Sequence, residues 1–142
     1  MSPTSRDAPE RLVVNVDGGA RGNPGPAAIG AVLTTPDGEV LERHGERIGK
    51  ATNNVAEYRA LLFGLERASE RGAREVEVVG DSELVVRQVQ GDYKVKDEAL
   101  KGLYAKVVKA LAGFDRWSIR HVRREDNEGA DSLVNAALDD LG

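Results

Sequence analysis

The first half of the chain consists of short apolar runs separated by turn residues. Residues 12–16 form an apolar run rich in valine, and residues 27–35 form a second one after a loop of glycine and proline. Residues 36–38, Pro-Asp-Gly, are typical of a turn, and residues 40–48 alternate like the returning arm of a hairpin. Because β-branched runs bounded by turns are typical of strands, the pattern predicts three consecutive strands.

The second half shows helical spacing interrupted by two more short apolar runs. In residues 54–71 the apolar positions recur at helical intervals, and Gly72 is placed to end the helix. Asp97 is predicted to cap a regular helix that stops near Gly113. The other predicted elements are, in chain order, a strand at 76–79, a helix at 82–90, a strand at 117–122, and a helix opened by Asn127 that includes Leu141.

The order of these elements predicts the fold class. Consecutive strands favour an antiparallel meander, while strands reached through helices favour parallel pairing with the first strand. The fold class is therefore α/β, with a five-stranded mixed sheet flanked by helices in one domain at residues 11–142. Residues 1–10 are polar and rich in proline and serine, so they predict a disordered N-terminal tail and not a signal peptide.

The composition is that of an ordinary globular domain, with 142 residues, 40% hydrophobic and 31% charged. No apolar run approaches the ~20 residues that span a bilayer, so we expect no membrane association. The absence of cysteine excludes disulfides, thiolate metal sites and a cysteine nucleophile, and it fits a reducing cytoplasm. A net charge of -4 is unusual for a protein that binds nucleic acid, so local charge would have to supply any phosphate contacts.

Four acidic residues stand where the pattern places strand ends or buried helix positions. Asp17 and Asp81 each follow a run of valines, so both are predicted to end strands at one edge of the sheet. Glu57 falls on the buried stripe of its helix, in the predicted first turn. Asp131 falls on the core-facing stripe of the last helix. We therefore expect four carboxylates from four elements to converge.

Each acid has an ordinary structural explanation when it is considered alone. An aspartate after a strand often caps a turn, and an acid near a helix start interacts favourably with the helix dipole. Four converging acids are different, because like charges repel one another unless cations lie between them. Oxygen ligands without thiolates favour hard ions, so the cluster predicts a site for Mg²⁺ or Mn²⁺.

Four motifs contain these acids. They are DGGARGNPGPA from Asp17, TNNVAEY from Thr52, GDS around Asp81, and NEGAD from Asn127. In this order, and within the predicted elements, they resemble the motifs of ribonuclease H of type I, in the short bacterial and archaeal form. The resemblance spans nearly everything after the tail, and it implies the ribonuclease H-like fold.

The resemblance implies an endoribonuclease that hydrolyses the RNA strand of RNA–DNA hybrids and leaves 5′-phosphate and 3′-hydroxyl ends. It also implies two Mg²⁺ or Mn²⁺ ions, which in such sites lie roughly 3.5–4 Å apart. Asp17 would bridge both ions, and Glu57 and Asp81 would complete the site around the scissile phosphate. Asp131 would hold the ion on the side of the nucleophile. These four residues are the predicted catalytic and metal-binding residues.

Residues next to the acids supply the predicted substrate contacts. Glycines let the backbone approach a sugar-phosphate closely, and short amide and hydroxyl side chains provide hydrogen bonds. Such contacts would recognise minor-groove shape and 2′-hydroxyl groups without specifying sequence. A turn with positive φ remains an alternative role for the glycines, and helix capping remains one for the asparagines. The predicted substrate-binding residues are Gly18, Gly19, Asn23, Asn53, Asn54, Ser82 and Arg124.

Two departures from the family pattern change the expected mechanism. Many relatives carry a histidine in the loop before the last helix, but residues 123–127 contain none. Arg124 matches an arginine of shorter-loop relatives and is expected to contact the departing phosphate, with a solvated surface arginine as the alternative. The basic, tryptophan-rich insertion that grips the DNA strand in some relatives is also absent. Residues 90–96 take its place, which predicts weaker and more salt-sensitive binding through Tyr93 and two lysines.

The same residues bear on two other function classes and on the expected partners. An exonuclease with four acids of the DEDD type is disfavoured because Gly19 stands where its opening D-x-E motif needs an acid, although His121 and Asp126 imitate its H-x₄-D element. A non-catalytic hybrid-binding module would keep the fold and lose an acid, yet all four are present. The expected partner is an RNA–DNA hybrid, with no obligate protein partner. We predict a monomer, since no apolar surface stripe indicates self-association.

Overall fold

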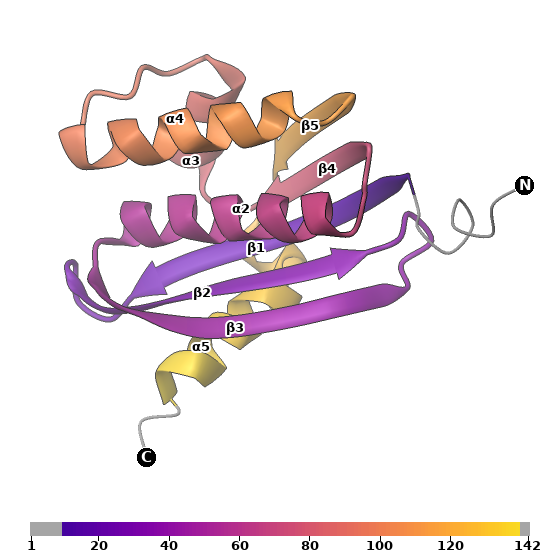
Figure 1. The fold of residues 1–142 in the computed structure, drawn as a ribbon. Helices are drawn as coiled ribbons and strands as arrows, with labels where there is room; N and C mark the ends of the chain where they lie inside the picture. Colours follow the sequence, from indigo (N-terminus) through magenta and orange to yellow (C-terminus); the bar gives the residue numbers. More distant parts are fainter. Residues whose placement is uncertain (1–9, 140–142) are drawn as a thin grey trace, which may run out of the picture.

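The computed structural model describes residues 10–139 and confirms the mixed α/β sheet (Figure 1). Its strands are β1 (Arg11–Ala20), β2 (Gly25–Thr34), β3 (Val40–Ala51), β4 (Glu75–Gly80) and β5 (Arg116–His121). They lie in the order β3-β2-β1-β4-β5. The first three form the predicted antiparallel meander, β4 pairs in parallel with β1, and β5 pairs in parallel with β4.

The helices within the described residues are α2 (Asn53–Glu70), α3 (Glu83–Gln90), α4 (Glu98–Ala112) and α5 (Glu128–Asp139), with a 3₁₀ turn η1 (Arg124–Asp126). Side chains of Thr52, Ser82 and Asp97 cap the first three of these helices. The capping role considered for Asn53 and Asn54 is therefore wrong, because Thr52 Oγ1 accepts the bond from the Val55 amide. None of the described helices is long and apolar enough to cross a membrane.

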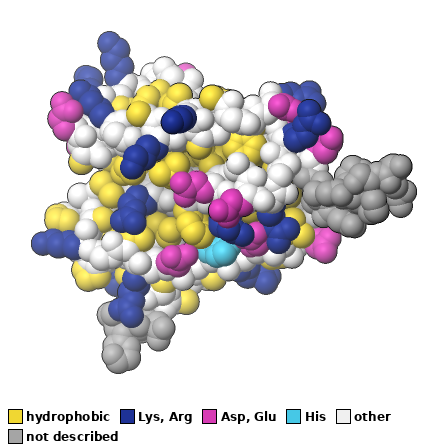
Figure 2. All heavy atoms as spheres, in the orientation of Figure 1, with side chains coloured by type: hydrophobic (Ala, Val, Ile, Leu, Met, Phe, Trp, Pro, Cys, Tyr) yellow, Lys and Arg dark blue, Asp and Glu magenta, His cyan; other side chains and the backbone are white. Residues whose placement is uncertain are grey.

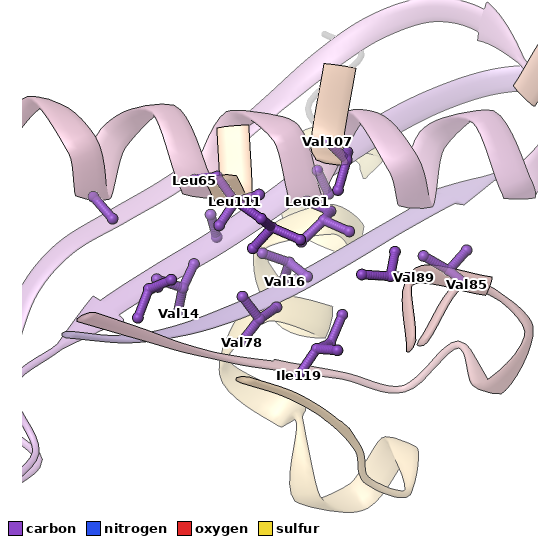
Figure 3. Packing of buried hydrophobic residues seen from close by; sticks show 14 of the residues in the cluster. Val14, Val16, Leu61, Leu65, Val78, Val85, Val89, Val107, Leu111 and Ile119 are labelled. Atoms are coloured by element: carbon purple, nitrogen blue, oxygen red, sulfur yellow. The ribbon is translucent and has the colours of Figure 1, made fainter. Parts of the chain in front are cut away.

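The helices cover the two faces of the sheet unequally. Figure 1 shows α2, α3 and α4 on one side of the sheet and α5 on the other. The larger core lies under the first group, where Figure 3 shows Val14, Val16 and Val78 of the strands meeting Leu61 and Leu65 of α2. All five side chains are buried, so this packing fixes α2 over β1.

The second face holds α5 at short range because β2 has a glycine beneath it. A Cβ atom at Gly30 would stand 2.4 Å from the carbonyl oxygen of Ala130, so any larger residue would push the helix away. Ala28, Val134 and Leu138 form a small apolar cluster at this contact. The start of α5 is thereby held against the middle of the sheet.

Both ends of the chain lie partly outside the described residues. Of the predicted tail at residues 1–10, only Glu10 is described, and its carbonyl oxygen accepts bonds from the Arg74 and Glu75 amides, each at 2.8 Å. Leu141, predicted inside the last helix, lies outside the described residues. The boundary between a tail and a domain at 11–142 stays a prediction.

Candidate active site

Asp17 and Asp81 lie side by side at one edge of the parallel part of the sheet. The parallel ladder between β1 and β4 ends with the pair Val16 and Gly80, so each aspartate directly follows a member of that pair in the chain. β4 itself ends at Gly80, so Asp81 directly follows its strand and does not end it, a difference of one residue from the prediction. The expectation that Asp17 ends β1 is wrong, because β1 continues to Ala20 through its antiparallel pairing with β2. The shared edge was nevertheless placed correctly, since it depends on the β1–β4 register.

Glu57 reaches the same edge from α2 because the helix backbone passes directly over Gly18. A Cβ atom at Gly18 would stand 2.3 Å from the carbonyl group of Ala56, a distance that no side chain can adopt. The Gly18 amide donates a hydrogen bond to Glu57 Oε1 at 2.5 Å. The sequence predicted that Glu57 lies in the first turn of its helix. Because α2 begins at Asn53, Glu57 lies in the second turn.

Three of the four predicted carboxylates come together at one point. One oxygen atom from each of Asp17, Glu57 and Asp81 lies within 4.8 Å of the others. Asp131, on α5, is not part of this group of three, but it lines the same cleft and contributes to the raised pKa of Asp17. Asp17 is the most deeply placed of these acids, with 5% of its surface exposed.

The convergence raises the pKa values of two of the acids, Asp17 and Glu57. Burial first, and then the charge of Asp81 and contacts with Asp131, raise the pKa of Asp17 to about 8. Burial and the charges of Asp17 and Asp81 raise the pKa of Glu57 well above its ordinary value, against smaller opposing effects of the Gly18 amide and Arg124. The protein alone therefore disfavours the fully ionised cluster, because it supplies too little positive charge to offset burial and the mutual repulsion of the acids.

The donor set fits a hard divalent cation. Asp81 Oδ2 is buried and has no hydrogen-bond partner, which is costly for a carboxylate unless another group binds there. All of the converging ligand atoms are carboxylate oxygens, the type that Mg²⁺ and Mn²⁺ prefer. A cation between the acids would satisfy the unpartnered oxygen and relieve the repulsion together.

An open cleft of about 460 Å³ surrounds the acids, and most of the predicted substrate-binding residues line it. These are Gly18, Gly19, Asn53, Asn54, Ser82 and Arg124. Asn23 does not line the cleft. Its Oδ1 accepts a bond from the Asn53 amide at 3.0 Å, and Asn53 Oδ1 accepts one from the Ala20 amide at 2.8 Å. Asn23 and Asn53 thus fasten the loop after β1 to the start of α2.

Two further asparagines support the site and were not predicted. Asn127 is buried, donates to the Val16 carbonyl at 2.9 Å and accepts from Asn15 Nδ2 at 3.1 Å. It therefore connects the start of α5 to β1 directly before Asp17. Asn135 lies one helical turn after Asp131 and donates to its carboxylate at 3.5 Å. The spacing of four residues could have indicated Asn135, whereas the inward direction of Asn127 required the structure.

Comparison with known proteins places this sheet and its acids in one class. A family model described as reverse transcriptase-like matches residues 15–137. The chain is similar to ribonuclease HI of Halobacterium salinarum, with 48% identity over 130 residues that cover 92% of this chain. It is also similar to the crystal structure of LC11-RNase H1 in complex with an RNA/DNA hybrid, with 47% identity, a TM-score of 0.86, and coverage of 90% of this chain and 96% of that one. The chain belongs to the ribonuclease H family, type I.

The relatives differ from this chain in length. The chain spans 65% of the halobacterial protein. It spans 36% of a bifunctional protein of Mycobacterium tuberculosis, to which it is 47% identical over 91% of its own length. The similarity therefore covers nearly all of this chain but only part of each of these two relatives.

Proposed function

We propose that this chain is an endoribonuclease that hydrolyses the RNA strand of RNA–DNA hybrids with the help of two divalent metal ions, Mg²⁺ or Mn²⁺. The observation that carries the proposal is the convergence of one oxygen atom from each of three carboxylates within 4.8 Å, and the unpartnered Asp81 Oδ2 supports it. The products would carry 5′-phosphate and 3′-hydroxyl ends. Membership of the ribonuclease H family supports this reaction over other uses of an acidic site.

Each carboxylate has a distinct place in the proposed reaction. When bound, the ions would activate a water molecule and stabilise the charge that develops on the leaving oxygen. Asp17 is grouped with Glu57 and Asp81 and is also influenced by Asp131, so it is the proposed shared ligand. Asp131 lines the same cleft as Asp17 and would hold the ion next to the nucleophilic water. The Gly18 amide keeps Glu57 directed toward the cleft.

The hydrogen-bonding groups that line the cleft suit recognition of a hybrid by shape. Asn53 Oδ1 is already engaged by the Ala20 amide, so its contact with a sugar hydroxyl would come from the side-chain nitrogen. Ser82 Oγ accepts the bond from the Val85 amide that caps α3, which leaves its hydroxyl hydrogen free to donate. Such groups distinguish RNA from DNA through the 2′-hydroxyl and do not specify base sequence.

Local charge offsets the net charge of -4. Figure 2 shows Lys and Arg side chains gathered over the half of this face that lies toward the tip of β1 and the start of α2. The acidic cluster lies toward this end of the molecule, because Asp17 belongs to the last part of β1 and Glu57 to the second turn of α2. A hybrid laid across it would place phosphates near cations and the scissile bond near the acids.

The direct test is a cleavage assay with a hybrid labelled on the RNA strand, in Mg²⁺ and in chelator. We expect internal cuts in the RNA strand only with metal, and no cuts in the DNA strand or in duplex DNA. Phosphatase and ligase treatment of the products reports the end groups. Tight hybrid binding without cleavage in any metal would instead indicate the non-catalytic binding module.

A further inference from the structure

The connection between α3 and α4 lies at the active-site end of the molecule. Figure 1 shows it leading back to the end where α2 begins. Residues 91–96 of this connection expose Tyr93, with 47% of its surface accessible, together with two lysines, Lys94 and Lys96. The sequence predicts that these three side chains contact the substrate.

This exposed segment is fastened to the end of α3 at several points. Gly91 adopts the left-handed conformation with φ at +90°, and the amides of Asp92 and Tyr93 both donate to the Arg87 carbonyl. The Arg87 guanidinium lies 5.8 Å from the centre of the Tyr93 ring, within the range of a cation–π contact. The aromatic ring is thereby held at the surface in one place.

The most informative attachment is a buried glutamine. Gln88 of α3 is 5% exposed, and its Oε1 accepts a hydrogen bond from the Tyr58 hydroxyl at 2.6 Å. Its Nε2 donates to the Lys94 carbonyl at 3.4 Å. Tyr58 is completely buried and directly follows Glu57 on α2. One side-chain amide therefore connects the helix that carries an active-site acid to the segment that carries the lysines.

Packing alone does not explain a glutamine at this position. Its neighbours on the buried side of α3 are Val85, Val86 and Val89, so an aliphatic side chain would fit the pattern of the helix. A buried amide costs stability unless its hydrogen bonds are made, and a polar pair in a core fixes geometry more than it adds stability. The bonds of Gln88 go to two elements that both belong to the proposed substrate surface.

We propose that Gln88 is a positioning residue for substrate binding. It holds residues 91–96 at a fixed distance from Glu57, so that Lys94 and Lys96 meet the phosphates of the hybrid when the scissile phosphate meets the acids. The inference rests on the proposed function. It assigns Gln88 no contact with the substrate, so its effect passes through the position of the lysines.

The test compares Gln88→Leu, Tyr58→Phe and the double variant on a labelled hybrid. Tyr58→Phe leaves the bond from Gln88 to Lys94 in place, so we expect its KM to stay near the wild-type value. Both variants that lack Gln88 should raise KM by about three- to tenfold with kcat nearly unchanged. Without Gln88 the two lysines are not held in place before binding, so part of the binding free energy is used to order them. The double variant leaves no buried group unpaired between α2 and α3, so its melting temperature should recover relative to Gln88→Leu.

The stability readout separates positioning from simple damage. If KM in the double variant returns to the wild-type value together with the melting temperature, Gln88 is only structural and the inference is wrong. A fall in kcat at constant KM would also contradict it, since that result would place the effect at the acids.

A second arm measures coupling to the lysines. Lys94→Ala with Lys96→Ala should raise the Kd for the hybrid in the wild-type background and have a much smaller effect in the Gln88→Leu background. Equal effects in both backgrounds would contradict the proposal. Kd is measured by fluorescence anisotropy in chelator, so this arm gives an answer even if the wild type does not cleave, an outcome that would overturn the proposed function alone.

Discussion

Two clusters of partly buried carboxylates in this protein are built in opposite ways. Glu42 of β3 has 10% of its side chain exposed, and its carboxylate accepts bonds from Arg67 Nε at 2.9 Å and from Arg71. With His44 also in contact, these partners lower the pKa of Glu42 to about 2. Asp17 is just as inaccessible, but burial and acidic neighbours raise its pKa to about 8. One cluster is neutralised by the protein and the other is not.

The difference shows where stability and function separate in this fold. Arg67 of α2 and Arg71, which directly follows the helix, fasten α2 to the edge strand β3, so the Glu42 cluster is complete within the protein. In the other cluster the described cation that acts on Glu57 is Arg124, whose effect is the smallest of those acting on that acid. If the acids bind metal ions as proposed, the cluster has to lack sufficient positive partners of its own, and the folded state is less stable until a metal ion binds.

The largest expected effect comes from changing the uncompensated cluster. Asp17→Asn keeps the shape of the side chain and removes the proposed shared ligand, so cleavage should fall by about 10³-fold, or about 4 kcal/mol in activation free energy. Binding of the hybrid in chelator should stay within about twofold, because the cleft keeps its other groups. Steady-state cleavage and anisotropy measure the two effects.

The matched control is Asp115→Asn. Asp115 is exposed and pairs with Arg74, directly before β5 and away from the cleft, and its change should leave cleavage intact. Retention of more than a few per cent of turnover by Asp17→Asn would remove Asp17 from its proposed role.

The second expected effect of Asp17→Asn is on stability: the variant should lose activity but gain free energy of unfolding. The folded-state pKa of Asp17 lies above its unfolded value, so the folded protein binds more protons between about pH 4 and pH 8. Metal-free wild type should therefore lose stability as the pH rises through that window. Asp17→Asn should be more stable near neutral pH by at least about 1.4 kcal/mol, the equivalent of one pKa unit.

Mg²⁺ provides the control for this second prediction. A ligand that binds only the folded state adds stability, so Mg²⁺ should raise the melting temperature of the wild type more than that of Asp17→Asn. Thermal melts from pH 4 to pH 8, in chelator and in excess Mg²⁺, measure this. A wild-type midpoint that ignores both pH and Mg²⁺ would mean that the acids do not form one metal site.

The third effect concerns the compensated cluster. Glu42→Gln removes the charge that Arg67 and Arg71 share, and it should destabilise the protein by about 1–2 kcal/mol at pH 7 with cleavage unchanged. The folded-state pKa lies below the unfolded value, so this contribution is complete above about pH 4.5 and disappears as the pH falls toward about 2. Urea titrations at pH 7 and pH 3 measure the loss. Glu46→Gln, on the exposed part of the same strand, is the matched control and should be neutral.

The sequence predicted the acidic cluster better than it predicted the supporting contacts. Valine runs before Asp17 and Asp81 indicate strands, and parallel strands that end together bring the following residues together, so local periodicity was sufficient. Asn127 and Gln88 were not predicted as connections, because the partners of a polar side chain in a core lie far away in the sequence. Asn127 bonds to Val16, and Gln88 bonds to Tyr58. The roles of Asn127 and Gln88 depend on tertiary packing, which a local sequence pattern does not predict.

The edge of the sheet was also not predicted from the sequence. The pattern at residues 117–122 predicts a strand, but it does not say how Trp117 and His121 lie within it. Both are exposed, Trp117 by 41% of its surface, because β5 is an edge strand and only Ile119 is buried along it. The sequence identifies a strand from its composition, but its position in the sheet decides how many faces are covered.

The smallest expected effect concerns Arg124. It tests whether this arginine partly neutralises the acidic cluster, as Arg67 and Arg71 neutralise Glu42. Arg124 is exposed and lines the cleft, and it lowers the pKa of Glu57 slightly. If it contacts the departing phosphate, Arg124→Ala should lower kcat by about threefold, or roughly 0.7 kcal/mol, with little change in KM.

The metal dependence of the same variant sharpens this last test, because it separates a contact with the phosphate from an electrostatic effect on the acids. A cation next to the cluster competes with Mg²⁺, so its removal should lower the Mg²⁺ concentration needed for half-maximal activity. Arg123→Ala is the matched control, since Arg123 pairs with Asp126 in the same turn and does not line the cleft. A lower kcat at saturating Mg²⁺ would show that Arg124 acts on the reacting phosphate, and a lower Mg²⁺ requirement with unchanged kcat would show that it acts on the acids alone. Kinetics identical to the Arg123 control would mean that Arg124 does neither.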